Sequence, residues 1–330
     1  MNEFELIESL TRELPGNATV VTGAGDDCAV LDLGLPDRWV LFKTDAVVEG
    51  VHYGPGTPPE KIGRKALARC LSDVAAMGGE PSSAVVTLAL PRDYSPVLVA
   101  GVMAGLNRLA REHGMAVVGG ETTTNPERML ISVALLGTVE KSRCVRRSGA
   151  QPGDALFVTG ELGGSGAGKH LDFEPRLAEA RWLTEHFAIH AMLDLSDGLA
   201  GDLRHLLRAS NVGAELLSDA IPISRAAYEQ AKHGVAASGA NGAGVAPSAG
   251  AALAQSGRTP LTAALTDGED FELLFTVASK DAVPLLDAWK GRFAPLRLSC
   301  VGRITAKPGL TIRDHAGFRP LELHGYTHFA

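Results

Sequence analysis

The sequence predicts a two-domain α/β protein, or an α+β variant of it, in which helices are layered against sheets. Its 330 residues exceed the length that one hydrophobic core usually serves. Apolar strand-like runs alternate with helical patterns along the chain, which is typical of layered domains. A basic, turn-rich segment at residues 146–154 separates two such series. We therefore expect an N-terminal domain at residues 1–145 and a C-terminal domain at residues 146–330.

In the N-terminal domain, apolar periodicity alternates between helical and strand-like spacing. Gly78-Gly79 and Pro81 are expected to end the central helix, as a C-terminal cap followed by a breaker. Asp27, Asp45 and Glu121 each fall at the edge of a predicted strand. We expect helices over 4–10, 59–77 and 97–113, and strands over 28–33, 39–42, 84–90, 115–118 and 129–139.

The C-terminal domain shows the same alternation, interrupted by one strongly biased piece. Residues 234–258 are nearly all Gly, Ala, Ser and Val, and we interpret them as a flexible insertion in which 249–255 could form a marginal helix. We expect strands over 155–159, 191–193, 214–217, 271–277 and 296–304, a short hairpin near the end, and helices over 175–187, from 199 onward, over 224–233 and over 282–290.

Composition excludes several classes of protein. The formal charge of −7 argues against a general nucleic-acid binder. No run approaches the ~20 apolar residues of a membrane span. The four cysteines form no C-x-x-C pair, and the acidic N-terminus indicates an amphipathic helix instead of a signal peptide. We therefore expect a cytoplasmic protein that binds neither nucleic acid nor membrane.

Carboxylates from separate segments are the strongest chemical signal. The turn within residues 190–203 places Asp194, Ser196 and Asp197 where a strand is followed by a helix. Each acid alone is adequately explained as a cap or a solvated side chain. Several acids brought together would repel one another unless cations intervene, and oxygen ligands without His or Cys suit Mg²⁺ or Ca²⁺ and not zinc. The candidates are Asp27, Asp45, Asp73, Glu121, Asp194 and Asp197.

The segment 163–170 nearly matches the P-loop pattern G-x-x-x-x-G-K-[S/T]. It follows a predicted strand, as a P-loop does. Its last position is His170, which lacks the hydroxyl that a P-loop uses to hold Mg²⁺. We therefore expect a glycine-rich connection and no Walker site.

A series of ordered motifs resembles the thiamine-monophosphate kinases, within the superfamily that includes aminoimidazole ribonucleotide synthetase and selenophosphate synthetase. The resemblance runs nearly from end to end. It is carried by G-D-D-C-A-V (25–30), T-D-A-V-V-E-G-V-H (44–52), K-A-L-A-R-C-L-S-D-V-A-A-M-G (65–78), G-G-E-T (119–122), R-S-G-A-Q-P-G-D (147–154), L-D-L-S-D-G-L (193–199), D-G-E-D-F-E-L-L-F (267–275) and G-Y-T-H-F (325–329).

This resemblance implies ATP-dependent phosphorylation of thiamine monophosphate to thiamine diphosphate, with several Mg²⁺ ions, in a homodimer of two-domain chains built on mixed sheets flanked by helices. No general base is expected, because the acceptor phosphate is already largely dianionic at neutral pH. Carried onto matching positions, the metal ligands would be Asp27, Thr44, Asp45, Asp73, Glu121, Asp194 and Asp197. The ATP contacts would be Gly120, Glu121, Arg147 and Ser196, and the thiamine phosphate contacts His52, Glu269 and Tyr326.

The chain departs from the family pattern at Lys43, Glu121 and Asp267. Lys43 stands where a small hydroxyl residue commonly helps to ligate metal, so that contact is lost or the ammonium takes the place of an ion. Glu121 is one methylene longer than the usual Asp, and Asp267 replaces a common glycine. These departures leave two alternatives open: another ATP-dependent enzyme of the superfamily, or a nucleotide-binding regulator that has lost catalysis.

Overall fold

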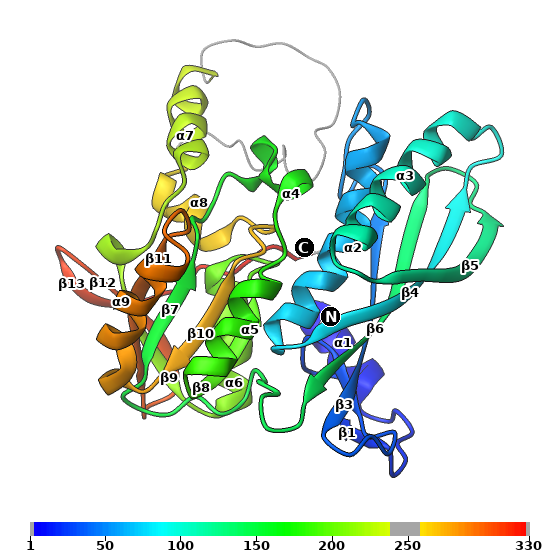
Figure 1. Ribbon diagram of the computed structural model, residues 1–330. Coiled ribbons are helices and arrows are strands. Elements are labelled where there is room, and N and C mark those ends of the chain that lie inside the picture. Colours follow the sequence, from blue (N-terminus) through cyan, green and yellow to red (C-terminus); the bar gives the residue numbers. More distant parts are fainter. Residues whose placement is uncertain (1–2, 238–257, 328–330) are drawn as a thin grey trace.

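The computed structural model describes residues 3–237 and 258–327, which form two mixed sheets with helices packed against them (Figure 1). In the first sheet the strand order is β1-β2-β3-β6-β4-β5, and β4 and β5 are parallel while the other pairs are antiparallel. Its strands are β1 (Val20–Thr22), β2 (Ala29–Leu31), β3 (Arg38–Val48), β4 (Glu80–Leu90), β5 (Ala116–Thr124) and β6 (Leu130–Glu140).

The second sheet is formed by the second half of the chain. Its order is β13-β12-β9-β11-β7-β10-β8, with β9 and β12 parallel. Its strands are β7 (Ala155–Thr159), β8 (Ile189–Asp194), β9 (Gly213–Leu217), β10 (Leu273–Val277), β11 (Leu298–Thr305), β12 (Gly309–Asp314) and β13 (Gly317–Pro320). The last two strands are the predicted hairpin.

The helices cover one face of the first sheet and both faces of the second. The first half has α1 (Glu3–Thr11), α2 (Pro59–Ala76) and α3 (Pro96–Glu112); the second has α4 (Lys169–Asp172), α5 (Leu177–His186), α6 (Leu199–Ser210), α7 (Arg225–Ala237), α8 (Pro260–Thr266) and α9 (Ala282–Arg292). Residues of α6 and α8 pack in one apolar cluster, and residues of α5 and α9 pack in another.

Helix α2 lies between the two sheets and belongs to both halves of the core (Figure 1). Leu67 and Leu71 pack with the strands of the first sheet. Ala75 and Ala76 pack with Phe157, Phe275 and their neighbours in the second half. The two halves therefore share a buried helix instead of touching only through their surfaces.

Two predicted strands continue further than the sequence indicated. β3 runs past residue 42 to Val48, because β6 pairs with it over its whole length, Asp45 lying opposite Val133. β5 likewise runs through Gly119 and Gly120 to Thr124, paired with β4. The expectation that Asp45 and Glu121 lie at strand edges is therefore wrong, since both lie inside strands.

Other expectations had mixed outcomes. Helix α1 forms, but Ile7 and Leu10 of its predicted apolar stripe are exposed. Helix α7 continues to Ala237, so residues 234–237 are helical and do not belong to an insertion. Residues 238–257, with the marginal helix predicted over 249–255, lie outside the described residues.

The short helices α4 and α8 had no counterpart in the sequence prediction. The domain limits at 145 and 146 stay a prediction.

None of the described helices is both long enough and apolar enough to cross a bilayer.

Candidate active site

A stripe of polar side chains runs along the buried helix α2. Lys65, Arg69, Ser72 and Asp73 follow the spacing i, i+4, i+7 and i+8, which places them on one face of the helix. Lys65 is fully buried, and Ser72 and Asp73 are nearly so. Burying such groups is costly unless each finds a partner, and these partners come from both halves of the chain.

Strand β3 supplies the partners from the first half. The Arg69 Nε atom lies 2.9 Å from Asp45 Oδ2, and the Lys43 ammonium donates to Asp73 Oδ1 at 2.8 Å. Successive strand residues point to opposite faces. Lys43 and Asp45 therefore face α2, while Thr44 points to the outer, exposed face of the sheet.

The second half supplies the remaining partners. The Ser72 hydroxyl donates to Asp194 Oδ2 at 2.5 Å, which ties α2 to the end of β8. Lys65 Nζ lies 2.6 Å from Glu269 Oε1 and donates to the His52 carbonyl oxygen at 2.6 Å. Helix α2 thus positions acidic groups from both halves around itself.

Three buried carboxylates meet at this junction. Asp27 follows β1, Asp73 lies on α2 and Asp194 ends β8, and one ligand atom of each lies within 4.8 Å of the others. Their exposures are only 1%, 6% and 5%. We call these residues the acidic triad.

The electrostatics of the acidic triad favour a bound cation. Burial, followed by the charge of Asp27, raises the pKa of Asp194 to about 6, and burial also raises the pKa of Asp73. Arg147 places Nε at 3.2 Å and Nη2 at 2.5 Å from Asp27 Oδ1, but Asp27 Oδ2 is buried and has no hydrogen-bond partner within residues 3–237 and 258–327. Hard oxygen ligands with such an unused buried oxygen fit a divalent ion such as Mg²⁺.

Two predicted metal ligands lie away from the acidic triad. Glu121 pairs across the strands with Thr87 on the outer face, the same face as Thr44. In the order β3-β6-β4-β5, its strand is three positions from β3, or about 14 Å at ~4.8 Å per strand. The structure therefore does not bring Thr44 and Glu121 to the acidic triad.

The turn after β8 links the acidic triad to the predicted substrate residues. The Asp197 N–H donates to Asp202 Oδ2 at 2.9 Å, and the Asp197 carbonyl accepts from the Tyr326 N–H at 2.8 Å. The Ser196 carbonyl accepts from the Glu269 N–H at 2.7 Å. Ser196, Asp197, Glu269 and Tyr326 are therefore held together by backbone hydrogen bonds.

Glu269 is the most constrained of the predicted substrate residues. Its φ of 64° is unusual for a residue with a side chain, and such strain is often kept at functional sites. Burial opposes its ionisation, but His170 and Lys65 outweigh this and lower the pKa of Glu269 to about 2. Burial and then the charge of Arg69 lower the pKa of His52 to about 4, so His52 is neutral at pH 7. The result is a fixed anion beside a neutral imidazole.

The glycine-rich segment is a connection, as predicted, and its amides bind the chain's own carboxylates. The Gly163 N–H donates to Asp270 Oδ2 at 2.9 Å, and the Gly164 N–H donates to Asp267 Oδ2 at 2.7 Å. Asp267 also forms an ion pair with Arg258. The departure at Asp267 therefore has a structural role in holding this loop.

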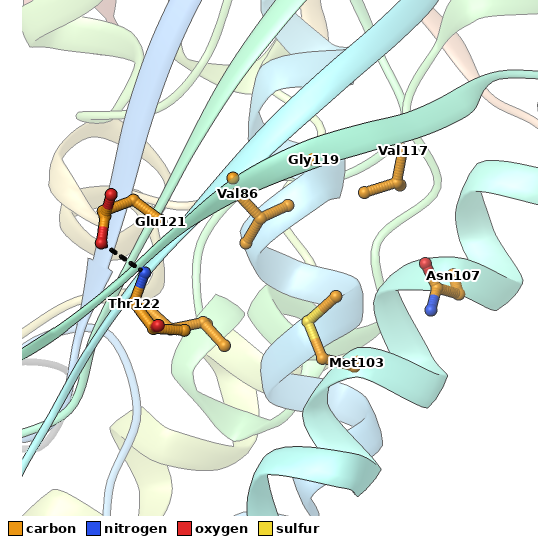
Figure 2. Close-up of a pocket in the computed structure, with 9 residues that line it drawn as sticks. Val86, Met103, Asn107, Val117, Gly119, Glu121 and Thr122 are labelled. Carbon is orange, nitrogen blue, oxygen red and sulfur yellow. Dashed lines mark hydrogen bonds between the residues drawn. The ribbon is translucent and has the colours of Figure 1, made fainter.

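A pocket of about 440 Å³ lies beside Gly120 and Glu121. Val86, Met103 and neighbouring apolar side chains form its walls. Figure 2 shows Glu121 and Asn107 on opposite sides of it. The Gly120 backbone approaches β4 so closely that a Cβ there would lie 1.8 Å from the Val86 carbonyl oxygen, so a glycine is required at this wall.

Sequence reasoning missed Arg69, Ser72, His170 and Asp202. The helix itself was predicted, over residues 59–77, but its polar stripe was not. The spacing of Lys65, Arg69, Ser72 and Asp73 could have revealed the first two residues, since polar side chains on the second face of a buried helix need partners. No local pattern could have revealed His170 or Asp202, because their contacts depend on the tertiary fold.

Comparison with known proteins agrees with this architecture. Residues 25–139 match the N-terminal domain of AIR synthase related protein, and residues 151–315 match its C-terminal domain. The chain is 38% identical to the thiamine-monophosphate kinase of Rhodopirellula baltica, covering 91% of this chain and 87% of that one, and 33% identical to that of Escherichia coli K12, covering 99% and 98%. The structure of AaThiL complexed with AMPPCP and TMP superposes with a TM-score of 0.78 at 30% identity, covering 99% of this chain and 97% of that chain.

The paired domain matches, together with the two mixed sheets, define a two-domain protein of the AIR synthase related class. Within that class, the chain belongs to the thiamine-monophosphate kinase family.

We expect Asp194→Asn to stabilise the metal-free protein at about pH 7.5, by on the order of 1–3 kcal/mol, and to do so less at about pH 5. The folded-state pKa of Asp194 is about 6, above the usual 3.8, so the ionised carboxylate costs stability above pH 6. That cost falls as the pH drops through 6 toward 3.8. Thermal melts in EDTA at both pH values measure the effect.

The exposed Asp93→Asn is the matched control and should leave both melts unchanged. A loss of metal-free stability in Asp194→Asn at the higher pH would contradict the electrostatic account of the acidic triad.

Proposed function

We propose that the chain transfers the terminal phosphoryl group of ATP to thiamine monophosphate, forming thiamine diphosphate and ADP. The observation that carries the proposal is the buried acidic triad at the junction of the two halves, in a chain whose relatives are thiamine-monophosphate kinases. One of those relatives, AaThiL, has been solved with AMPPCP and TMP.

Mg²⁺ would be held by Asp27, Asp73 and Asp194. The other two predicted ligands, Asp45 and Asp197, lie on neighbouring segments. Bound Mg²⁺ neutralises charge on the phosphate oxygens during transfer. Thr44 and Glu121 lie on the outer face, on strands three positions apart, so each would hold a cation only at a position separate from the acidic triad. The unused oxygen of Asp27 supports binding of a metal ion at the acidic triad.

The chain's own residues then have to bring two polyanions together. The acceptor phosphate is already a nucleophile, so binding and alignment take the place of proton abstraction. Arg147 supplies a positive charge beside Asp27 of the acidic triad, and Lys65 supplies one beside Glu269. The Glu269 carboxylate, kept anionic by its low pKa, suits the cationic thiazolium ring of the substrate, with His52 and Tyr326 nearby.

Incubation with ATP, Mg²⁺ and thiamine monophosphate should yield thiamine diphosphate, and Asp197→Asn should lower kcat by at least ~100-fold while leaving the melting temperature nearly unchanged. Asn preserves the backbone contacts of Asp197 but removes its charge. The exposed Asp93→Asn is the control. Tight ATP binding without product would favour the regulator instead, and a near-normal rate in Asp197→Asn would remove Asp197 from the site.

We further propose that the pocket beside Gly120 and Glu121 accepts the adenosine part of ATP. Its volume lies within the range of small-molecule sites, and its apolar walls suit a flat base. Gly120 and Glu121, which line the pocket, would then contact the nucleotide. Contact of Ser196 with ATP stays a prediction. Asn107 offers one amide to the edge of the base.

Met103→Trp should fill this pocket and raise the KM for ATP by roughly tenfold or more, without raising the KM for thiamine monophosphate. Val97→Trp lies on the exposed side of the same helix and is the matched control. Steady-state kinetics with each substrate varied in turn separate the two effects. An unchanged KM for ATP would place the nucleotide elsewhere.

A homodimer and a cytoplasmic location complete the proposal. The outer face of the first sheet exposes Phe42, Val85 and Leu136, and Phe42 lies opposite Leu136 across β3 and β6. Large exposed apolar patches commonly mark interfaces. A second copy, with the same apolar face, is the occupant that we propose. The cysteines, all four of which are free, support a reducing compartment.

Sedimentation velocity should give a mass twice the 34.5 kDa of one chain. Leu136→Glu should shift the protein toward the single-chain mass, because burying a carboxylate in an apolar interface is costly. Val283→Glu, at an equally apolar exposed position on α9, is the control and should leave the mass unchanged. A wild-type protein that sediments as one chain would contradict the dimer.

A further inference from the structure

Lys43 places a positive charge against the acidic triad. Its ammonium donates to Asp73 Oδ1 at 2.8 Å, and its side chain is only 23% exposed. It lies on the face of β3 that packs against α2, two residues from Asp45. The contact is therefore made inside the site and not at the protein surface.

The charges around the acidic triad show what the ammonium does there. Asp27, Asp73 and Asp194 supply three carboxylates. Arg147 pairs with Asp27, and Lys43 pairs with Asp73. Among the described residues, the side-chain hydrogen bond to the Asp194 carboxylate comes from the neutral hydroxyl of Ser72. Two paired cations, Arg147 and Lys43, thus face three buried carboxylates. Without Lys43, Arg147 alone would be paired with them.

An ammonium cannot share its position with a metal ion. It has three donors and no lone pair, so it cannot ligate a cation, and it repels any divalent ion brought to the same oxygen. The 2.8 Å contact between the Lys43 ammonium and Asp73 Oδ1 is that of an ion pair, and the ammonium fills the space beside that oxygen.

Taking the acidic triad as the metal site of the proposed function, we propose that the Lys43 ammonium permanently occupies the place of one divalent cation beside Asp73. The wild-type chain then binds one fewer divalent ion at this cluster than the same chain with a hydroxyl at position 43. Lys43 is a positioning residue: it holds Asp73 through Oδ1 and leaves the other oxygen of Asp73, with the Oδ2 atom of Asp27 and with Asp194, for the remaining ion.

Metal counting tests this directly, with Mn²⁺ as the probe and no substrate present. Lys43→Thr should bind about one additional equivalent of Mn²⁺ by calorimetric titration and by electron paramagnetic resonance. Lys43→Arg keeps the positive charge and should bind the same number of Mn²⁺ ions as the wild type. Lys141→Thr is the matched control, because it removes an ammonium that pairs with Asp32 at 3.1 Å, far from the acidic triad. This variant should also bind the wild-type number of Mn²⁺ ions.

Thermal melts supply a second readout. In EDTA, Lys43→Thr should melt at a lower temperature than the wild type, because the acidic triad then lacks one of its two cations. Added Mg²⁺ should restore much of this loss, since a divalent ion enters the vacated position. Lys141→Thr should show no such Mg²⁺-dependent recovery.

Two results would overturn the proposal. One is an unchanged Mn²⁺ number in Lys43→Thr. The other is a Lys43→Thr protein that stays unfolded in excess Mg²⁺, since a divalent ion must be able to replace the ammonium. Because neither readout uses ATP or thiamine monophosphate, a failure of the proposed kinase activity would be seen separately in the product assay.

Discussion

The structure depends on burying a polar stripe of one helix between two sheets. Helix α2 carries Lys65, Arg69, Ser72 and Asp73 into the interior, and each has a partner there. Two of the partners come from β3 and two from the second half of the chain. Unpaired buried charges are far more costly than paired ones. The pairing therefore fixes the register of the two halves and, by the same contacts, assembles the acidic triad.

The same constraint accounts for the division of the site into distinct regions. The acidic triad is formed where Ser72 and Asp73 meet β8, while Lys65, nearer the N-terminus of the helix, holds Glu269. The turn that contains Ser196 and Asp197 joins these regions through backbone hydrogen bonds to Glu269 and Tyr326. The Gly120 pocket lies on the far strand of the first sheet.

The sequence was sufficient to predict the α/β class, most of the elements and the resemblance to the family, because periodic apolar patterns and ordered motifs are local signals. It misplaced Asp45 and Glu121 at strand edges, since strand length depends on how far β6 pairs with β3 and how far β4 pairs with β5. The alternation along β3, which separates Lys43 and Asp45 from Thr44, became visible only once that strand was known to continue. The role of Asp267, which binds the Gly164 amide, depends on a contact across about a hundred residues that no local pattern encodes.

The central claim is that Asp27, Asp73 and Asp194 form a single divalent-cation site assembled by α2. Anomalous diffraction from crystals of the wild-type protein grown with Mn²⁺ tests it most directly. The account predicts an anomalous peak in contact with carboxylate oxygens of all three residues, at ligand distances of roughly 2.0–2.3 Å. A protein that binds Mn²⁺ elsewhere, and shows no peak between these carboxylates, would contradict the account.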